Sequence, residues 1–206
     1  RSCGADREQA RGNAVWMSNQ AGLLQGVTTV VSGNCGYGYS DMNDYYTFID
    51  SLPFGPNTYY LTPHGYLRQD LFGDNQPETL EPAQMDRLKA KLAEEMEKGA
   101  IGMSTGLGYV PGINAPKAEL IELGRVLKRY NGIYVSHIRN EPPTDFSTAC
   151  AQVMEGIAEA IDIGRQARIP VQISHIKGYR GGTAADFDAI CAAIEDARGE
   201  GIDVTA

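Results

Sequence analysis

The segment Gly132-Ile-Tyr-Val-Ser-His137 is a short apolar run that ends in a histidine, and Pro170-Val-Gln-Ile-Ser-His175 repeats this arrangement further along the chain. Both runs have the length and the β-branched or aromatic composition of a strand. A helix-like stretch lies between them, with apolar residues at Val153, Ile157 and Ile161. The order strand, helix, strand predicts a parallel sheet with right-handed crossovers.

The same alternation extends over most of the chain. Four further segments read as strands: 26–33, 57–62, 100–105 and 201–205. Three more stretches read as helices: one from Pro82 at its first turn to Gly99 at its end, one that Asn131-Gly132 stops, and one that a Thr183/Asp186 capping box opens. Residues 36–56 and 106–116 are expected to be longer loops. Six such strands suit either an open doubly wound sheet or six staves of a (β/α)8 barrel, and the pattern does not choose between the two.

Composition narrows the function classes. Of the 206 residues, 42% are hydrophobic and 21% charged, which is enough for a packed core. The formal charge of −8 argues against a nucleic-acid surface, and no apolar run approaches the roughly 20 residues that span a bilayer. The four cysteines form no CxxC pattern, so a reduced, cytoplasmic compartment is expected. The chain starts Arg1-Ser2-Cys3 without a methionine or signal segment, so we expect a piece of a longer chain.

The few metal-capable side chains share one position relative to the strands. His64, His137 and His175 each follow a predicted strand, and Cys35 lies just past another. Because the carboxyl ends of parallel strands lie on one face, these four side chains are expected to converge there. A mixed thiolate and imidazole set predicts a divalent-metal site, most simply zinc. The alternative is that each is an isolated, packed core side chain.

Two of these histidines are followed by a cation two residues later: Arg139 and Lys177. In an extended chain, residues two apart point to the same side. Such a cation could receive a substrate carboxylate, or it could be a solvated loop charge.

Several longer motifs resemble the N-acyl-D-amino-acid deacylases (D-aminoacylases) of the amidohydrolase superfamily. They are Gly26-Val-Thr-Thr-Val-Val-Ser-Gly-Asn-Cys-Gly36, Pro63-His-Gly-Tyr-Leu-Arg68, residues 99–112, Tyr134-Val-Ser-His-Ile-Arg-Asn-Glu141, Pro170-Val-Gln-Ile-Ser-His-Ile-Lys177 and Gly201-Ile-Asp-Val-Thr-Ala206. The resemblance covers about residues 20–206 in the family's order. We therefore assign residues 20–206 to a partial metal-dependent hydrolase barrel domain and leave residues 1–19 unassigned.

The resemblance implies a (β/α)8 barrel, present here as about six βα units without the first and last strands. It also implies zinc-dependent hydrolysis of the amide bond of small N-acyl amino acids, of D configuration, with one or two ions. The metal ligands would be Cys35, His137 and His175. The substrate site would include Lys177 at the substrate carboxylate together with Arg139, His64 and Ser104.

The chain also departs from the family pattern. It has no His-x-His pair, and the aspartate that shuttles the proton would be expected beyond Ala206, so we assign no catalytic residue within this chain. One rival interpretation is a cysteine hydrolase with Cys35 as nucleophile and His137 or His175 as base. Another is a non-catalytic barrel fragment or small-molecule binding domain. Metal analysis with chelation tests the first, and the flanking gene sequence tests the second. The acyl group, the side-chain preference and the oligomeric state stay open.

Overall fold

The computed structural model describes residues 18–74, 76–141, 143, 145, 148–177 and 182–206, so residues 1–17 of the unassigned segment lie outside the described part. All six segments predicted as strands form strands: β1 (Thr29–Ser32), β2 (Asn57–Pro63), β3 (Gly102–Gly106), β4 (Ile133–His137), β5 (Val171–Ile173) and β6 (Val204–Thr205). They make one sheet in the order β1-β2-β3-β4-β5-β6, and every neighbouring pair is parallel.

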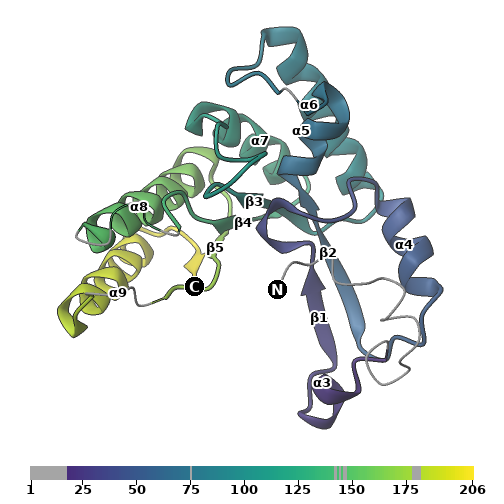
Figure 1. Ribbon diagram of the computed structural model, residues 1–206, viewed down its shortest axis with the longest axis horizontal. Coiled ribbons are helices and arrows are strands. Elements are labelled where there is room, and N and C mark those ends of the chain that lie inside the picture. Colours follow the sequence, from purple (N-terminus) through teal and green to yellow (C-terminus); the bar gives the residue numbers. More distant parts are fainter. Residues whose placement is uncertain (1–17, 75, 142, 144, 146–147, 178–181) are drawn as a thin grey trace.

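Helices connect the strands and follow the outer side of the curled sheet in sequence order (Figure 1). They are α4 (Met42–Asp50), α5 (His64–Phe72), α6 (Pro82–Glu97), α7 (Lys117–Arg129), α8 (Ala149–Ala167) and α9 (Ala184–Gly199). A short helix, α3 (Gln20–Leu24), precedes β1. A doubly wound sheet would reverse its strand order at a switch point, whereas this order runs in one direction. The fold is therefore an incomplete (β/α)8 barrel, as predicted.

Capping and proline signals in the sequence correctly predicted where the longer helices α6 and α9 begin. Pro82 is the first residue of α6, and Thr183 and Asp186 form the expected capping box at the start of α9. The cap at the end of α6 is Lys98, and Gly99 follows it with a φ of 109°, a conformation that favours glycine. Gly99 thus lies one residue beyond its predicted place.

The expected loop over residues 36–56 is wrong, because α4 lies within it. The Asp41 side chain accepts a hydrogen bond from the Asn43 backbone N–H at 2.8 Å and so caps the helix. Tyr45 of α4 is buried and stacks on Tyr60 of β2, with ring centroids 4.0 Å apart. The helix could not be predicted from the sequence, because it has a single side-chain cap and its buried apolar residues span only about one turn. The second expected loop, residues 106–116, is confirmed apart from Gly106, which ends β3, since residues 107–116 contain no helix or strand.

The core lies between the sheet and its helices. Fully buried residues include Leu88 and Leu92 from α6, Met103 and Tyr134 from the strands, and Ile157 from α8. This packing buries the helix faces that the apolar spacing marked and leaves the carboxyl ends of the strands to carry the polar residues described below. Among the described residues, no helix combines the length and apolar character needed to cross a membrane.

Candidate metal centre

The three predicted metal ligands meet at the carboxyl end of the sheet. Cys35 lies in a short 3-10 turn, η1 (Asn34–Gly36), just after β1, while His137 ends β4 and His175 follows β5. Cys35 Sγ lies 3.5 Å from His175 Nε2, and His137 Nδ1 lies 3.1 Å from the same nitrogen. All three ligand atoms are within 4.8 Å of one another.

The outer nitrogens of both imidazole rings face groups of Glu141. His137 Nε2 is 2.9 Å from the Glu141 carbonyl oxygen, and His175 Nδ1 is 2.9 Å from the Glu141 carboxylate Oε1. Both oxygens are acceptors, so each outer nitrogen is the one that carries the proton in a neutral ring. The inner nitrogens, His137 Nδ1 and His175 Nε2, then carry lone pairs inside the cluster that they form with Cys35.

This donor set fits a divalent metal. Two imidazole lone pairs 3.1 Å apart repel each other unless a proton or a cation lies between or beside them. Burial lowers the pKa of His137 against the opposing effect of Glu141, and the Lys177 ammonium acts in the same direction as burial, which favours the neutral ring that a metal requires. Two nitrogens and a sulfur are ligands typical of zinc.

The turn that presents Cys35 is held from below by Ser104 of β3. The Ser104 hydroxyl is fully buried, accepts a hydrogen bond from the Gly36 N–H at 3.0 Å and donates to the Gly33 carbonyl. The Tyr109 hydroxyl also donates to the Cys35 carbonyl at 2.8 Å. Cys35 itself has a φ of 61°, which is uncommon for a residue with a side chain. Its unusual backbone is therefore fixed by side-chain contacts, and Ser104 supports the cluster through the turn.

The two predicted substrate-binding cations have different surroundings. The Lys177 ammonium pairs with the Glu141 carboxylate at the edge of the cluster, and its side chain is half exposed. Arg139 instead forms a two-pronged contact with Glu159 of α8, at 2.8 and 3.1 Å, and donates to carbonyls of the loop after β3. Arg139 thus ties that loop to α8, while Lys177 stays beside the cluster.

The structure does not bring His64 into the cluster, so the expected convergence of four metal-capable side chains is corrected to three. His64 starts α5, is fully buried and places its Nε2 2.8 Å from Glu119 Oε1. The other Glu119 oxygen lies 2.5 Å from Arg68 Nη1. His64 therefore belongs to a buried ion-pair group with Glu119 and Arg68 at the start of α5, and its predicted contact with substrate stays a prediction.

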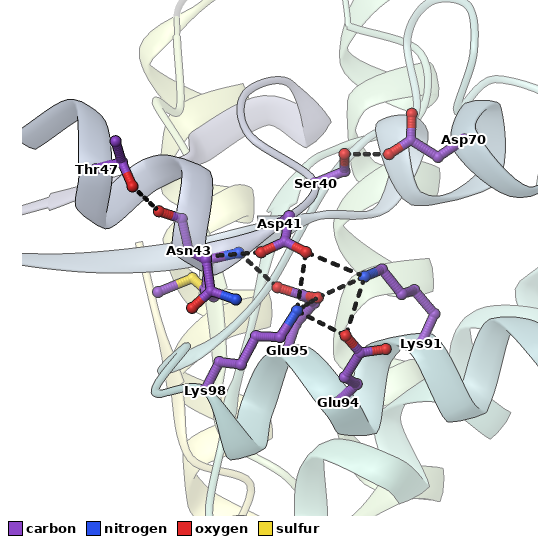
Figure 2. A network of polar contacts seen from close by, with 10 residues as sticks. Ser40, Asp41, Asn43, Thr47, Asp70, Lys91, Glu94, Glu95 and Lys98 are labelled. Atoms are coloured by element: carbon purple, nitrogen blue, oxygen red, sulfur yellow. Dashed lines mark hydrogen bonds and ion pairs between the residues drawn. The ribbon is translucent and has the colours of Figure 1, made fainter.

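A separate group of three acidic side chains also has the ligand atoms that a cation would need. Asp41, Glu94 and Glu95 lie close together, but Figure 2 shows the ammonium groups of Lys91 and Lys98 among their carboxylates. Lys98 Nζ is 2.9 Å from both Asp41 and Glu95, and Lys91 Nζ is 2.7 Å from Glu95. The lysines supply the counter-charge there, so this group is an ion-pair network between α4 and α6.

Sequence reasoning missed the role of Glu141. It lies in the irregular segment after β4, four residues beyond His137, where no periodic pattern indicates direction. The usable signal is chemical: metal-bound histidines commonly donate their second N–H to a carboxylate or a carbonyl. An acidic residue shortly after a ligand strand is a candidate for that partner.

Comparison with known proteins agrees with this geometry. No family model matches the chain. The chain is similar to a D-aminoacylase of Alcaligenes xylosoxydans xylosoxydans, with 31% identity over 178 residues that cover 75% of this chain and 35% of that protein. It is equally similar, at 31% over 204 residues, to an N-acyl-D-glutamate deacylase of the same organism, covering 87% of this chain and 40% of that protein.

Among solved structures, the chain superposes on N-acyl-D-glutamate deacylase from Bordetella bronchiseptica, complexed with zinc and a phosphonate inhibitor. The TM-score is 0.78 at 27% identity, covering 97% of this chain and 44% of that chain. The chain thus spans between about a third and somewhat less than half of the length of these relatives. These similarities agree with the sequence motifs, the parallel barrel strands and the cluster at the strand ends. The chain belongs to the N-acyl-D-amino-acid deacylases of the amidohydrolase superfamily.

Proposed function

We propose that this chain carries the metal-binding part of a zinc-dependent amidohydrolase that cleaves the amide bond of N-acyl-D-amino acids. The observation that carries the proposal is the meeting of Cys35 Sγ, His137 Nδ1 and His175 Nε2 within 4.8 Å at the carboxyl end of the sheet. The names of the similar proteins, D-aminoacylase and N-acyl-D-glutamate deacylase, support the substrate class.

The cluster suits one zinc ion, held by Cys35, His137 and His175. A zinc ion in such a site lowers the pKa of water and polarises a carbonyl oxygen. The residues of this chain hold the ion, set the direction of the ligand lone pairs and keep the Cys35 turn in place through Ser104. A second ion would need donors in addition to these three.

Lys177 is the proposed receptor of the substrate carboxylate. Its ammonium lies beside the cluster on Glu141, and half of the side chain is exposed, so it can reach an anion bound over the metal site. A charge-assisted contact of this kind contributes about 1.5 to 3 kcal/mol. Arg139 and Ser104 have donors committed to the protein itself, which supports positioning roles for both.

The experiment uses the protein that contains this chain. We expect about one zinc per site, hydrolysis of N-acyl-D-amino acids, and loss of both on chelation with recovery on adding Zn²⁺. The Lys177→Ala variant should keep its zinc and lose about 10- to 150-fold in kcat/KM. A substrate whose carboxylate is blocked as an amide should show little of that loss. Equal losses on both substrates would remove Lys177 from the substrate site, and activity unaffected by chelation would reject the metal mechanism.

A second candidate rests on the 3.5 Å contact between Cys35 Sγ and His175 Nε2. A thiol beside an imidazole is also the pair that a cysteine hydrolase uses. This candidate predicts that alkylation of Cys35 abolishes activity in metal-free protein and that a covalent acyl-enzyme accumulates. The 3.1 Å approach of the second histidine ring favours the metal, because a nucleophile needs only one base.

A further inference from the structure

Glu141 contacts both histidines of the cluster through two different groups. Its backbone carbonyl faces His137 Nε2 and its carboxylate faces His175 Nδ1, each at 2.9 Å. The Glu141 side chain is 3% exposed, so its carboxylate is buried although the His175 ring that it meets is partly exposed. One residue therefore spans the ligands of two different strands, β4 and β5.

We propose that Glu141 is the positioning residue of the metal centre, setting the tautomer and the direction of both histidine ligands. A neutral imidazole carries one N–H, and the ring takes the tautomer that places this N–H on an acceptor. Since the carbonyl and carboxylate oxygens accept only, both rings are held with their lone pairs inside the cluster that they form with Cys35. The inference rests on the proposed function, because it assigns a role at the same metal site.

The neighbouring backbone also fits the contact between the Glu141 carbonyl oxygen and His137 Nε2. Asn140 has a φ of 64°, a left-handed turn that is uncommon outside glycine. Gly108 lies against the same carbonyl group. A Cβ added at Gly108 would be 2.1 Å from the Glu141 carbonyl oxygen and 3.2 Å from His137 Nε2. A side chain at residue 108 would thus displace the acceptor that orients His137.

The two contacts can be tested separately. Glu141→Ala removes the acceptor of His175 and leaves the carbonyl that faces His137, whereas Gly108→Ala displaces the carbonyl and leaves the carboxylate. Removing such a partner of a metal ligand lowers metal affinity about 10- to 100-fold. We expect losses of this size in both variants, measured as Zn²⁺ affinity by chelator competition, together with an altered visible spectrum of the Co²⁺-loaded protein.

Matched controls separate positioning from general damage. Glu155→Ala removes another carboxylate of the same region, one that faces Asn140, and Gly199→Ala adds a methyl group where no atom lies within 4 Å. Both should keep wild-type Zn²⁺ affinity and the wild-type Co²⁺ spectrum. Glu141→Gln keeps the side-chain volume and one acceptor oxygen, so it should recover part of the affinity lost in Glu141→Ala, and it remains informative if the alanine variant fails to fold.

The outcomes distinguish this inference from the proposed function. If the wild-type protein binds Zn²⁺ and the Glu141→Ala variant binds it with equal affinity and shows an unchanged Co²⁺ spectrum, only the positioning role is overturned. A glutamine variant no better than a folded alanine variant would also overturn it, since acceptor geometry would then be irrelevant. Wild-type protein that binds no Zn²⁺ would overturn the proposed function and this inference together.

Discussion

Replacing Glu119 by Gln should strongly destabilise the protein without touching the metal cluster. Glu119 and Arg68 are buried, with side chains 3% and 1% exposed, and their charged groups are 2.5 Å apart. The second Glu119 oxygen holds His64 at 2.8 Å. The substitution leaves the Arg68 guanidinium buried without its carboxylate and beside neutral acceptors such as Gln76 Oε1 and the Pro77 carbonyl. Breaking a buried pair by removing one partner costs about 3 to 5 kcal/mol.

The assay is equilibrium unfolding by urea at pH 7, with thermal unfolding beside it. For a chain of this length, a loss of that size lowers Tm by about 6 to 20 °C. The control is Glu122→Gln on the same helix, whose side chain is 40% exposed and pairs with Arg125. It should stay within about 0.5 kcal/mol of wild type. A loss below about 1 kcal/mol in Glu119→Gln would refute the reasoning.

The pH dependence gives a second check on Glu119. Burial acts to raise the pKa of this carboxyl group, but His64 and Arg68 overcome that effect and hold the pKa below its ordinary value. A lowered pKa in the folded state contributes stability above the ordinary carboxyl pKa of about 4.3, and this contribution disappears as pH falls through the lowered value. The stability difference between wild type and Glu119→Gln should be constant from pH 7 to about 5 and shrink below about 4. A difference that stays constant in acid would contradict this account.

Three further predictions concern the cluster and the ion-pair network. His175→Ala should lose most of its bound zinc, as measured by elemental analysis, because one of three ligands is gone; retention of zinc would place the metal elsewhere. Ser104→Ala should cost about 1 to 3 kcal/mol of unfolding free energy, because a buried Gly36 N–H loses its acceptor, and should also weaken Zn²⁺ binding through the Cys35 turn. Glu95→Gln should lower stability by about 1 to 3 kcal/mol through Lys91, Lys98 and the Met42 N–H, with zinc content unchanged. A drop in zinc content there would show that the acidic group does bind metal.

Much of the fold could be predicted because its signals are local. The spacing of apolar residues marks each strand and each long helix, and their alternation implies parallel pairing. The strand-end positions of Cys35, His137 and His175 predicted that they meet, since parallel strands place their carboxyl ends together, but the same argument wrongly included His64. The short helix α4 escaped prediction because its stability comes from Asp41 and from Tyr45 packing on a distant strand, and not from a long apolar face.

The hydrogen-bond and ion-pair partners of the polar side chains could not be predicted from the sequence and are set by the tertiary structure. Arg139 and Lys177 follow their histidines in the same register, yet one pairs with Glu159 of α8 and the other with Glu141. His64 occupies a strand end like the other histidines, but it pairs with Glu119 on α7.

The sequence by itself determined which residues stand at the carboxyl end of the sheet, because strand ends follow from local apolar patterns. The tertiary structure decided which of them face one another, and it gave Glu141 its contacts with both His137 and His175. Those contacts depend on how β4 and β5 lie side by side and on how residues 138–141 bring Glu141 back to the His137 ring. Such long-range geometry arises from the packing of the whole sheet against its helices, and no local spacing of residues encodes it.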